Sequence, residues 1–314
     1  MNPRIEIEST RSLAGALGDP FWGWEIPVYL FLGGLVAGLL VVTSIVVLTR
    51  GRDRVTPAMR AGLLAAPVLL SLGMGALFLD LTSRAHVYRF YLTLRPTAPM
   101  SFGAWILLLV YPVQVLLAFA FPHASLEPWL SRRRWLRHVV ELSRRRLALV
   151  AWVGLASGIA LGVYTGVLLS ATVARPLWSF SGLGLLFLAS GASAALALLL
   201  VLERDAAAQR SLARWDIAVL AAELALVGLW IVGLLGLGPV HRAAAGALVS
   251  GAAAPAFLGI VIFGGIVVPL ALEVLWLRGR ALHSRAVPAL VLAGSLALRI
   301  LVVYAGQDLG FPRA

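Results

Sequence analysis

The chain has 314 residues, of which 61% are hydrophobic and only 13% are charged, and its formal net charge is +12. Because a soluble domain holds about a quarter charged residues, this composition excludes a soluble globular protein and indicates an integral membrane protein. The chain has no cysteine, which excludes disulfides, iron–sulfur clusters and thiolate metal sites within it. Its basic residues are all arginine and nearly all flank apolar runs, a pattern typical of membrane topology and anionic membrane lipid, not of nucleic-acid binding.

Eight apolar segments are each long enough to cross a membrane as a helix of about 20 residues. They cover residues 26–49, 61–81, 102–121, 147–170, 177–202, 216–237, 255–277 and 286–306. The segments are apolar all round instead of alternating, which excludes a transmembrane β-barrel. We therefore predict an all-α integral membrane bundle of eight transmembrane helices, which forms one domain over residues 1–314.

The arginines are distributed unevenly between the two sides of this predicted bundle. Seventeen lie in the connections after the first, third, fifth and seventh segments, eight lie at the termini and in the other connections, and Arg299 lies inside the eighth segment. The positive-inside rule therefore places both termini on the outer, periplasmic side of a bacterial cytoplasmic membrane. The arginine-rich stretch 132–146 is the strongest cytoplasmic marker, and we interpret it as an anchor to anionic lipid.

The first segment opens with polar and aromatic residues, FWGWEIPVYLFLGG over 21–34. Glu25 lies at the start of the helix, where a carboxylate either complements the helix dipole or exchanges protons. Tyr29 lies one turn deeper on the same side, since residues four apart align on a helix. Gly34 and Gly38 have the spacing of small residues that allow close contact with a neighbouring helix.

The connection from Asp80 to Trp105 is the most polar, aromatic and proline-rich one that is not simply basic. Prolines end helices, and Arg, His, Tyr and Trp suit a membrane interface, so residue chemistry alone indicates an interfacial loop with an aromatic belt. Its final part, PTAPMSFGAW over 96–105, resembles the NPTSPMSWGAW motif of the NrfD/PsrC family, the membrane subunits of polysulfide reductase and related complexes. Its first part, DLTSRAHVYR over 80–89, resembles the DLGR…HVWR lead-in of the same family.

Further motifs extend this resemblance from the first segment to the end of the chain. The family pattern W-x-x-x-x-YLFLGG matches residues 24–34, Y-x-G-x-L-L…RPLW matches 164–178, and LRILVVYAGQ over 298–307 resembles the family's last helix. In the family, a histidine and an asparagine of the first helix contact quinone. The corresponding positions here are Tyr29, which keeps a hydrogen-bond donor, and Ile26, which does not.

Three charged residues fall inside the later apolar segments, where ionisable groups are costly and indicate function by default. Asp216 and Glu223 are seven residues apart in the sixth segment and therefore share one helix face. They indicate either a proton path on the cytoplasmic side or a hydrogen bond that holds helices together. Arg299, in the eighth segment, is predicted to pair with a carboxylate such as Asp80 or Glu25.

The resemblance implies that the chain binds quinone or quinol, either menaquinone or ubiquinone, near the outer face. Tyr164 matches the family tyrosine that contacts a quinone carbonyl, and we expect Tyr29 and His86 to orient the head group with it. The full set of residues expected to bind the quinone is Trp24, Tyr29, Arg84, His86, Pro99, Met100, Ser101, Trp105 and Tyr164.

Quinone chemistry moves two electrons and two protons, so titratable groups are expected near the site. The residues expected to take part are Glu25, Asp80, His86, Asp216, Glu223 and Arg299. The first three would exchange protons with the quinone. Asp216 and Glu223 would link the site to the cytoplasm, which would make turnover electrogenic.

All histidines fall in connections or at segment ends, at His86, His123, His138, His241 and His283. No pair faces across the bundle to ligate a haem, so we expect no haem, no iron–sulfur cluster and no other redox centre in this chain. The resemblance implies an iron–sulfur cluster subunit on the outer side as the electron-exchange partner. It also implies either a molybdopterin catalytic subunit or a multihaem cytochrome in the same complex.

Two other functions remain open from the residues alone. Buried carboxylates and proline-kinked helices would also suit a secondary transporter or channel, although the sequence shows no convincing repeat between its halves. A purely structural membrane anchor is the third possibility. It would tolerate replacement of Tyr164 and His86 without loss of quinone-dependent activity.

Overall fold

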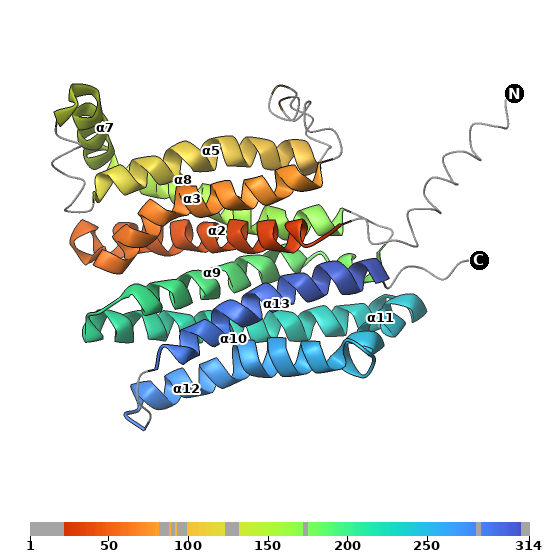
Figure 1. The fold of residues 1–314 in the computed structure, drawn as a ribbon. Helices are drawn as coiled ribbons and strands as arrows, with labels where there is room; N and C mark the ends of the chain where they lie inside the picture. Colours follow the sequence, from red (N-terminus) through yellow and green to blue (C-terminus); the bar gives the residue numbers. More distant parts are fainter. Residues whose placement is uncertain are drawn as a thin grey trace, which may run out of the picture.

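The structure is a computed structural model of the chain. It describes residues 22–81, 88, 92, 99–122, 132–171, 175–280 and 284–308. All regular secondary structure in these residues is helical, as the sequence predicts. Figure 1 shows long helices that run alongside one another, with the short helix α7 (Arg134–Arg145) set across one end.

Eight helical stretches of the described residues are long and apolar enough to cross a membrane, which confirms the predicted number of spans. They are α2 (Glu25–Arg50), α3 (Pro57–Asp80), α5 (Pro99–Ala120), α8 (Leu147–Ser170), α9 (Leu183–Leu202), α10 (Ala206–Leu237), the continuous pair η4 (Pro255–Val267) and α12 (Val268–Leu277), and α13 (Ala286–Asp308). Their sequences are rich in leucine, valine and alanine. In lipid such a segment folds as a helix, because only then does it satisfy all of its backbone N–H and C=O groups internally.

The fifth span starts later than the sequence predicts. Residue 177 is the expected start, but α9 begins at Leu183. The reason is a separate 3₁₀ turn, η3 (Pro176–Trp178), which buries the Trp178 side chain completely. This apolar turn cannot be told from a helix by hydropathy alone.

The sixth span starts earlier than predicted, at Ala206 and not at residue 216. Asp205 caps this start by accepting a 2.7 Å hydrogen bond from the Ala208 N–H. The polar turns that follow, AAAQRSLARW, have high helix propensity, so the helix extends well beyond its apolar part.

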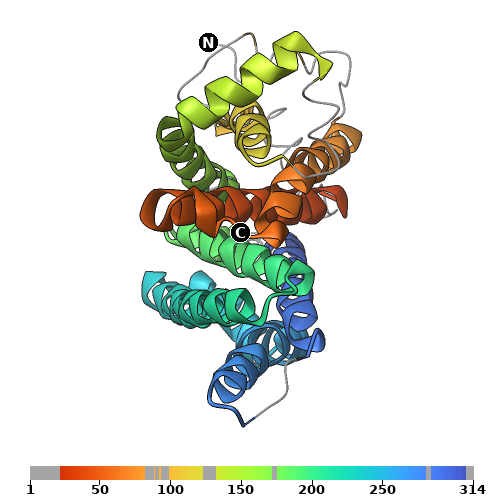
Figure 2. The ribbon, with the colours of Figure 1, turned by 90° about the vertical axis from the view of Figure 1, so that its left-hand side faces the viewer.

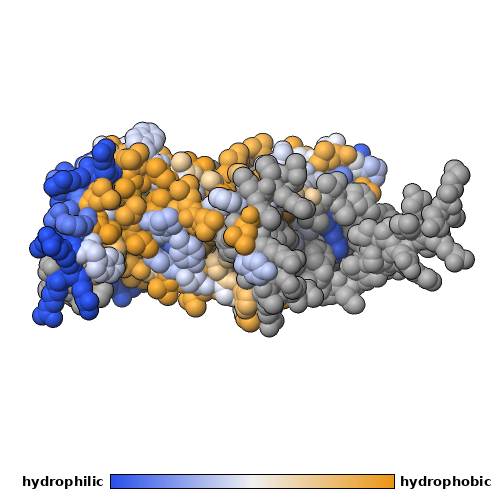
Figure 3. All heavy atoms as spheres, turned by 90° about the horizontal axis from the view of Figure 1, so that it is seen from above, coloured by the Kyte–Doolittle hydropathy of each residue, from blue (hydrophilic) through white to orange (hydrophobic). Residues whose placement is uncertain are grey.

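Short helices also form in the connections. They are η1 (Arg52–Arg54), α7 and α11 (Pro239–Val249). In α7, Leu136 and Val140 are buried, whereas Trp135 is 63% exposed. Figure 3 shows that hydrophilic side chains gather at the end of the molecule that carries α7. We call this the arginine-rich end, because Arg50, Arg52, Arg54 and the arginines of α7 lie there.

The spans form two groups that meet along α2 and α9 (Figure 2). One group contains α2, α3, α5 and α8, and the other contains α9, α10, η4–α12 and α13. The two groups approach closely at small residues. A Cβ atom added at Gly191 of α9 would lie 2.8 Å from the Gly34 carbonyl carbon, and one added at Gly38 would lie 2.7 Å from the Gly191 carbonyl carbon. The close contact predicted at Gly34 and Gly38 is therefore confirmed.

The seventh span changes helix type along its length. It is π-helical in η4 and α-helical in α12, and Pro269 lies at the change. Proline has no N–H, so it cannot complete the regular hydrogen-bond ladder with the preceding turn. The change comes shortly before Glu273, a buried acid of α12.

The two ends of the described chain lie against each other. Gln307 of α13 accepts a 2.9 Å hydrogen bond from the Trp22 N–H and donates one of 3.1 Å to the Trp22 carbonyl. The Trp22 ring stacks on Trp178 of η3, with a centroid distance of 5.4 Å. Trp178 in turn donates a 2.8 Å hydrogen bond to the Val302 carbonyl. These contacts hold the residues that lead into α2.

Candidate functional site

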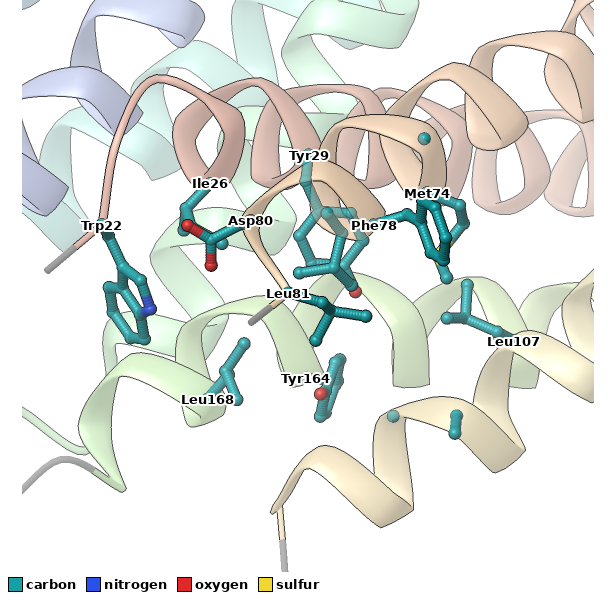
Figure 4. Close-up of a pocket in the computed structure, with 14 residues that line it drawn as sticks. Trp22, Ile26, Tyr29, Met74, Phe78, Asp80, Leu81, Leu107, Tyr164 and Leu168 are labelled. Atoms are coloured by element: carbon teal, nitrogen blue, oxygen red, sulfur yellow. The ribbon is translucent and has the colours of Figure 1, made fainter. Parts of the chain in front are cut away.

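A cavity of about 430 Å³ lies between α2, α3, α5 and α8, at the end of the bundle opposite the arginine-rich end (Figure 4). Its apolar lining includes Trp22, Ile26, Met74, Leu77, Phe78, Leu81, Leu107 and Leu168. Its hydroxyl and carboxyl groups belong to Tyr29, Asp80 and Tyr164. An apolar cavity with a few convergent polar groups is typical of a site for a small organic molecule.

Two tyrosines from different helices contribute their rings to this cavity (Figure 4). Tyr29 of α2 is 1% exposed, and Tyr164 of α8 is 6% exposed. Each phenol can donate a hydrogen bond to a carbonyl oxygen, and each ring can stack on a flat ligand. The structure therefore brings together two residues that come from separate sequence motifs.

Gly103 of α5 determines where the Tyr164 ring can lie. A Cβ atom added at Gly103 would collide with the ring and the hydroxyl of Tyr164. Glycine is required here because the ring approaches the α5 backbone closely. Sequence reasoning did not select Gly103, although it lies within the PMSFGAW motif, because the residue that it contacts is on another helix.

The acids Asp80 and Glu25 lie near each other but differ in their access to the cavity. Asp80 ends α3, and its carboxylate lines the cavity (Figure 4). Glu25 begins α2, and its carboxylate lies against Gly23 outside the cavity lining. The two negative charges repel each other electrostatically. A proton or a hydrogen-bond donor beside Asp80 would relieve this repulsion.

The aromatic residue that α2 brings to the cavity is Trp22, whereas the sequence predicts Trp24. Trp24 is 57% exposed and does not line the cavity. The spacing explains this difference, because Trp22, Ile26 and Tyr29 are four and three residues apart and share one face. Trp105 is 41% exposed and Ser101 is buried, and neither lines the cavity.

Four other residues predicted to bind a ligand cannot be placed by their side chains. Arg84 and His86 lie outside the described residues, and the side chains of Pro99 and Met100, at the start of α5, do so too. Asp80 and Ser101 lie on either side of this part of the chain. The connection predicted to complete the site therefore leaves α3 and enters α5 beside the cavity.

Arg299 of α13 is fully buried and lies against the middle of α2. Its Nε donates a 3.0 Å hydrogen bond to the Leu30 carbonyl. Gly34 leaves room for the guanidinium, since a Cβ atom there would lie 2.5 Å from Nη2. Arg299 therefore does not pair with Asp80 or Glu25, and that prediction is wrong. Those acids lie at the helix ends, whereas Arg299 enters the bundle more than a turn deeper.

The other hydrogen bonds of Arg299 lead to a polar group inside the bundle. Its Nη1 donates to the Ser295 hydroxyl at 2.7 Å and to the Ser190 hydroxyl at 3.1 Å. Ser193, on the same helix as Ser190, donates a 2.8 Å hydrogen bond to Glu223 Oε2. Glu223 is also the carboxylate that attracts Arg299 electrostatically. Serines of α9 thus connect the arginine of α13 to the glutamate of α10.

Asp216 and Glu273 form a buried acid pair between α10 and α12. Both carboxyl oxygens of Asp216 lack any donor among the described residues, so the contact with Glu273 becomes a hydrogen bond only when one carboxyl carries a proton. Glu223 lies near enough to Asp216 to repel it when both are charged. Asp216 and Glu223 are both buried on one side of α10, as their spacing predicts.

Glu273 is a buried acid that sequence reasoning missed. The signal was present, because Glu273 is the acid within the seventh apolar segment, and the cost of an ionisable group in a span applies to it as to Asp216. What the sequence does not contain is the pairing. Only the packing of α12 against α10 places the two acids side by side.

Comparison with known proteins covers nearly the whole sequence. The family model described as polysulphide reductase, NrfD, matches residues 14–309. The C subunit of polysulfide reductase from Wolinella succinogenes is 32% identical over 309 residues, which cover 91% of this chain and 94% of that protein. Protein NrfD of Escherichia coli is 33% identical over 310 residues, which cover 91% of this chain and 95% of that protein. The chain therefore belongs to the NrfD family of polysulphide reductase membrane subunits.

Proposed function

We propose that the chain is the quinone-reactive membrane subunit of a respiratory oxidoreductase complex. The observation that carries this proposal is the apolar cavity with Tyr29, Tyr164 and Asp80 in its lining. A quinone head group is flat and largely apolar and has two carbonyl oxygens, so it matches an apolar cavity with two phenol donors. Membership of the polysulphide reductase family supports the same assignment.

In this proposal the tyrosines orient the head group and the acids handle protons. The Tyr164 and Tyr29 hydroxyls donate hydrogen bonds to the carbonyl oxygens and stabilise the negative charge that develops there. Asp80 takes up or releases protons beside the ring, and Glu25 extends that route outwards. His86 and Arg84 keep their predicted roles in the connection that follows α3.

Electrons enter or leave through a partner subunit. Iron–sulfur clusters need cysteine ligands, and the chain has none. We therefore place an iron–sulfur subunit at the cavity end of the bundle, together with a molybdopterin catalytic subunit or a multihaem cytochrome. The relative from Wolinella succinogenes bears the name of a lettered component of polysulfide reductase, which supports a complex of several subunits.

The cavity end faces the periplasm in this proposal. The arginine-rich end, with α7 and η1, faces the cytoplasm according to the positive-inside rule. The joined residues Trp22 and Gln307 then lie on the outer side, and so do both termini. The protein is a multi-pass protein of the bacterial cytoplasmic membrane with its quinone site near the outer face.

A polar row inside the second group of helices connects this site to the cytoplasmic side. It begins at Arg299, which contacts the carbonyl of Leu30 next to Tyr29, and it continues through Glu223 to Asp216 and Glu273. Carboxyl groups that share protons can pass them along such a row. Turnover is then electrogenic, because protons cross part of the membrane.

Purification of the complex in mild detergent tests this function. Co-purifying proteins and the lipid-soluble extract are analysed by mass spectrometry. The expected result is bound quinone together with a cysteine-rich iron–sulfur subunit or a multihaem cytochrome. A protein that purifies alone and without quinone, and that moves a solute across reconstituted vesicles, would replace this proposal with the transporter alternative.

A tyrosine pair tests the cavity itself. Tyr164→Phe removes one hydrogen bond to the quinone oxygen, and we expect quinone-dependent turnover to fall by about tenfold to a hundredfold. Tyr111→Phe is the matched control, because Tyr111 lies on α5 outside the cavity and hydrogen-bonds the exposed Ser71. Equal turnover of both variants would favour a structural anchor.

A further inference from the structure

A second cavity, of about 470 Å³, lies at the arginine-rich end, where α2 and α3 meet α9 and α10. Part of its wall is apolar and includes Val46, Met59, Leu212 and Trp215. The charged residues that line it are Arg50, Asp53, Arg54, Arg60, Glu203 and Asp205. It therefore combines an apolar surface with charges of both signs at the ends of four spans, far from the cavity at the other end of the bundle.

Two buried atoms of opposite charge line this cavity and have no hydrogen-bond partner. One is Arg60 Nε, in the first turn of α3, and the other is Glu203 Oε2, at the end of α9. Glu203 is only 3% exposed. In the part of the chain that the structure describes, these residues form no ion pair with each other. Unpaired buried charges are costly, so both atoms indicate a ligand from outside the chain.

Neighbouring charges already have contacts within the protein. Arg50 Nη1 donates a 2.8 Å hydrogen bond to the Ser211 hydroxyl, and its guanidinium lies 5.0 Å from the centre of the Trp215 ring. Asp205 caps α10. The other oxygen of Glu203, Oε1, accepts the Asp205 N–H at 3.2 Å. The two unpartnered atoms are thus the ones left to meet a ligand.

We propose that this cavity binds the headgroup of an aminophospholipid. A phosphate oxygen accepts a hydrogen bond from Arg60, and the ammonium group donates to Glu203 Oε2. The apolar wall, with Trp215, covers the glycerol and the start of an acyl chain, as expected for residues at the membrane interface. A lipid with anionic charge alone, or free phosphate, would place its negative charge near Glu203 and leave that carboxylate unpaired.

Lipid add-back to the full-length protein tests the ligand class. The purified protein is stripped of lipid and titrated with phosphatidylethanolamine, phosphatidylglycerol or inorganic phosphate, and binding is followed by native mass spectrometry and by the melting temperature. We expect phosphatidylethanolamine to bind on the order of tenfold more tightly than phosphatidylglycerol, and inorganic phosphate to have no effect. Equal binding of the two lipids, or stabilisation by inorganic phosphate, would overturn the proposal.

Single variants locate the two contacts. Glu203→Gln keeps the Oε1 acceptor for the local backbone N–H groups, so the helix end is preserved while the charge is removed. This variant should lose the preference for phosphatidylethanolamine, and Arg60→Gln should weaken the binding of both lipids by about tenfold. Arg52→Gln is the control, because Arg52 is exposed at the same end but does not line the cavity. Full retention of the preference in Glu203→Gln would mean that the cavity holds only water.

Discussion

Glycines make room for the large polar side chains at two functionally important positions. Gly103 of α5 leaves room for the Tyr164 ring, and Gly34 of α2 leaves room for the Arg299 guanidinium. In each case the polar residue and the glycine come from different helices. The placement of a polar group therefore depends on a side chain that is absent from the opposite helix.

Substitution of Gly103 should disturb the cavity without removing any polar group. In Gly103→Ala the new Cβ displaces the Tyr164 ring. Because a shift of about 1 Å in a positioned group can cost about a hundredfold in rate, quinone-dependent turnover should fall by tenfold or more. Gly228→Ala is the control, since an added Cβ there meets no atom within 4 Å. Wild-type turnover in Gly103→Ala would show that the ring position is unimportant.

Loss of the Arg299 charge should destabilise the whole bundle. Arg299→Gln leaves Glu223 buried without its positive partner, and we expect the free energy of unfolding in detergent to fall by about 3–5 kcal/mol. Thermal and chemical denaturation measure this loss. The double variant Arg299→Gln with Glu223→Gln should lose less than the sum of the two single variants. Additive losses would show that the two charges are not coupled.

The residues that sequence reasoning placed at the site differ in how well they could be predicted. Tyr29, Asp80 and Tyr164 lie within recognisable motifs, and all three line the cavity. Trp22 and Gly103 were missed because their roles depend on the facing helix. The partner of Arg299 was unpredictable for the same reason, since hydropathy does not show which face of α13 meets α2 and which meets α9.

Whole helices were easier to predict than their ends. The cost of exposing backbone polar groups to lipid ensures that each long apolar run forms a span, and all eight predicted spans are present among the described residues. Outside the lipid that constraint ends. The start of α10 is then set by a capping aspartate and helix propensity, and α11 forms in a stretch that hydropathy assigns to a connection.

The capping role of Asp205 is testable at the level of this helix. Asp205→Ala removes the acceptor for the Ala208 N–H, and we expect a local loss of about 1 kcal/mol. Hydrogen exchange of the amides at 206–209 should become faster, while exchange in the apolar part of α10 stays unchanged. Asp53→Ala is the control, because the Asp53 side chain is 97% exposed. Unchanged exchange at 206–209 would show that the cap contributes nothing.

In the molecule as a whole, the cavity and the acid row occupy different helix groups. The cavity lies within the group of α2, α3, α5 and α8, whereas Glu223, Asp216 and Glu273 lie in the other group. Arg299 connects them, because it contacts α2 from α13. The prediction of one domain over residues 1–314 remains a prediction, and the close contact of α2 with α9 supports it.

Separation of the two groups predicts that proton movement and quinone binding can be separated by mutation. Asp216→Asn cannot hold the proton shared with Glu273, so the complex in sealed vesicles should generate a much smaller membrane potential during turnover. Quinone affinity should stay within about twofold of the wild type, because Asp216 does not line the cavity. Glu141→Gln, on the surface of α7, is the control. An unchanged membrane potential in Asp216→Asn would exclude this row as the proton route.

The span that carries Arg299 is the last one to be synthesised. By the time α13 emerges, its acceptors on α2 and α9 have already entered the membrane. An arginine at the centre of a lone helix opposes insertion by about 2.5–3.5 kcal/mol, so these waiting acceptors favour the entry of α13. A polypeptide that stops short of Arg299 leaves the Glu223 carboxylate in the membrane without its cation. Biosynthesis of a stable bundle thus depends on completion of its final helix.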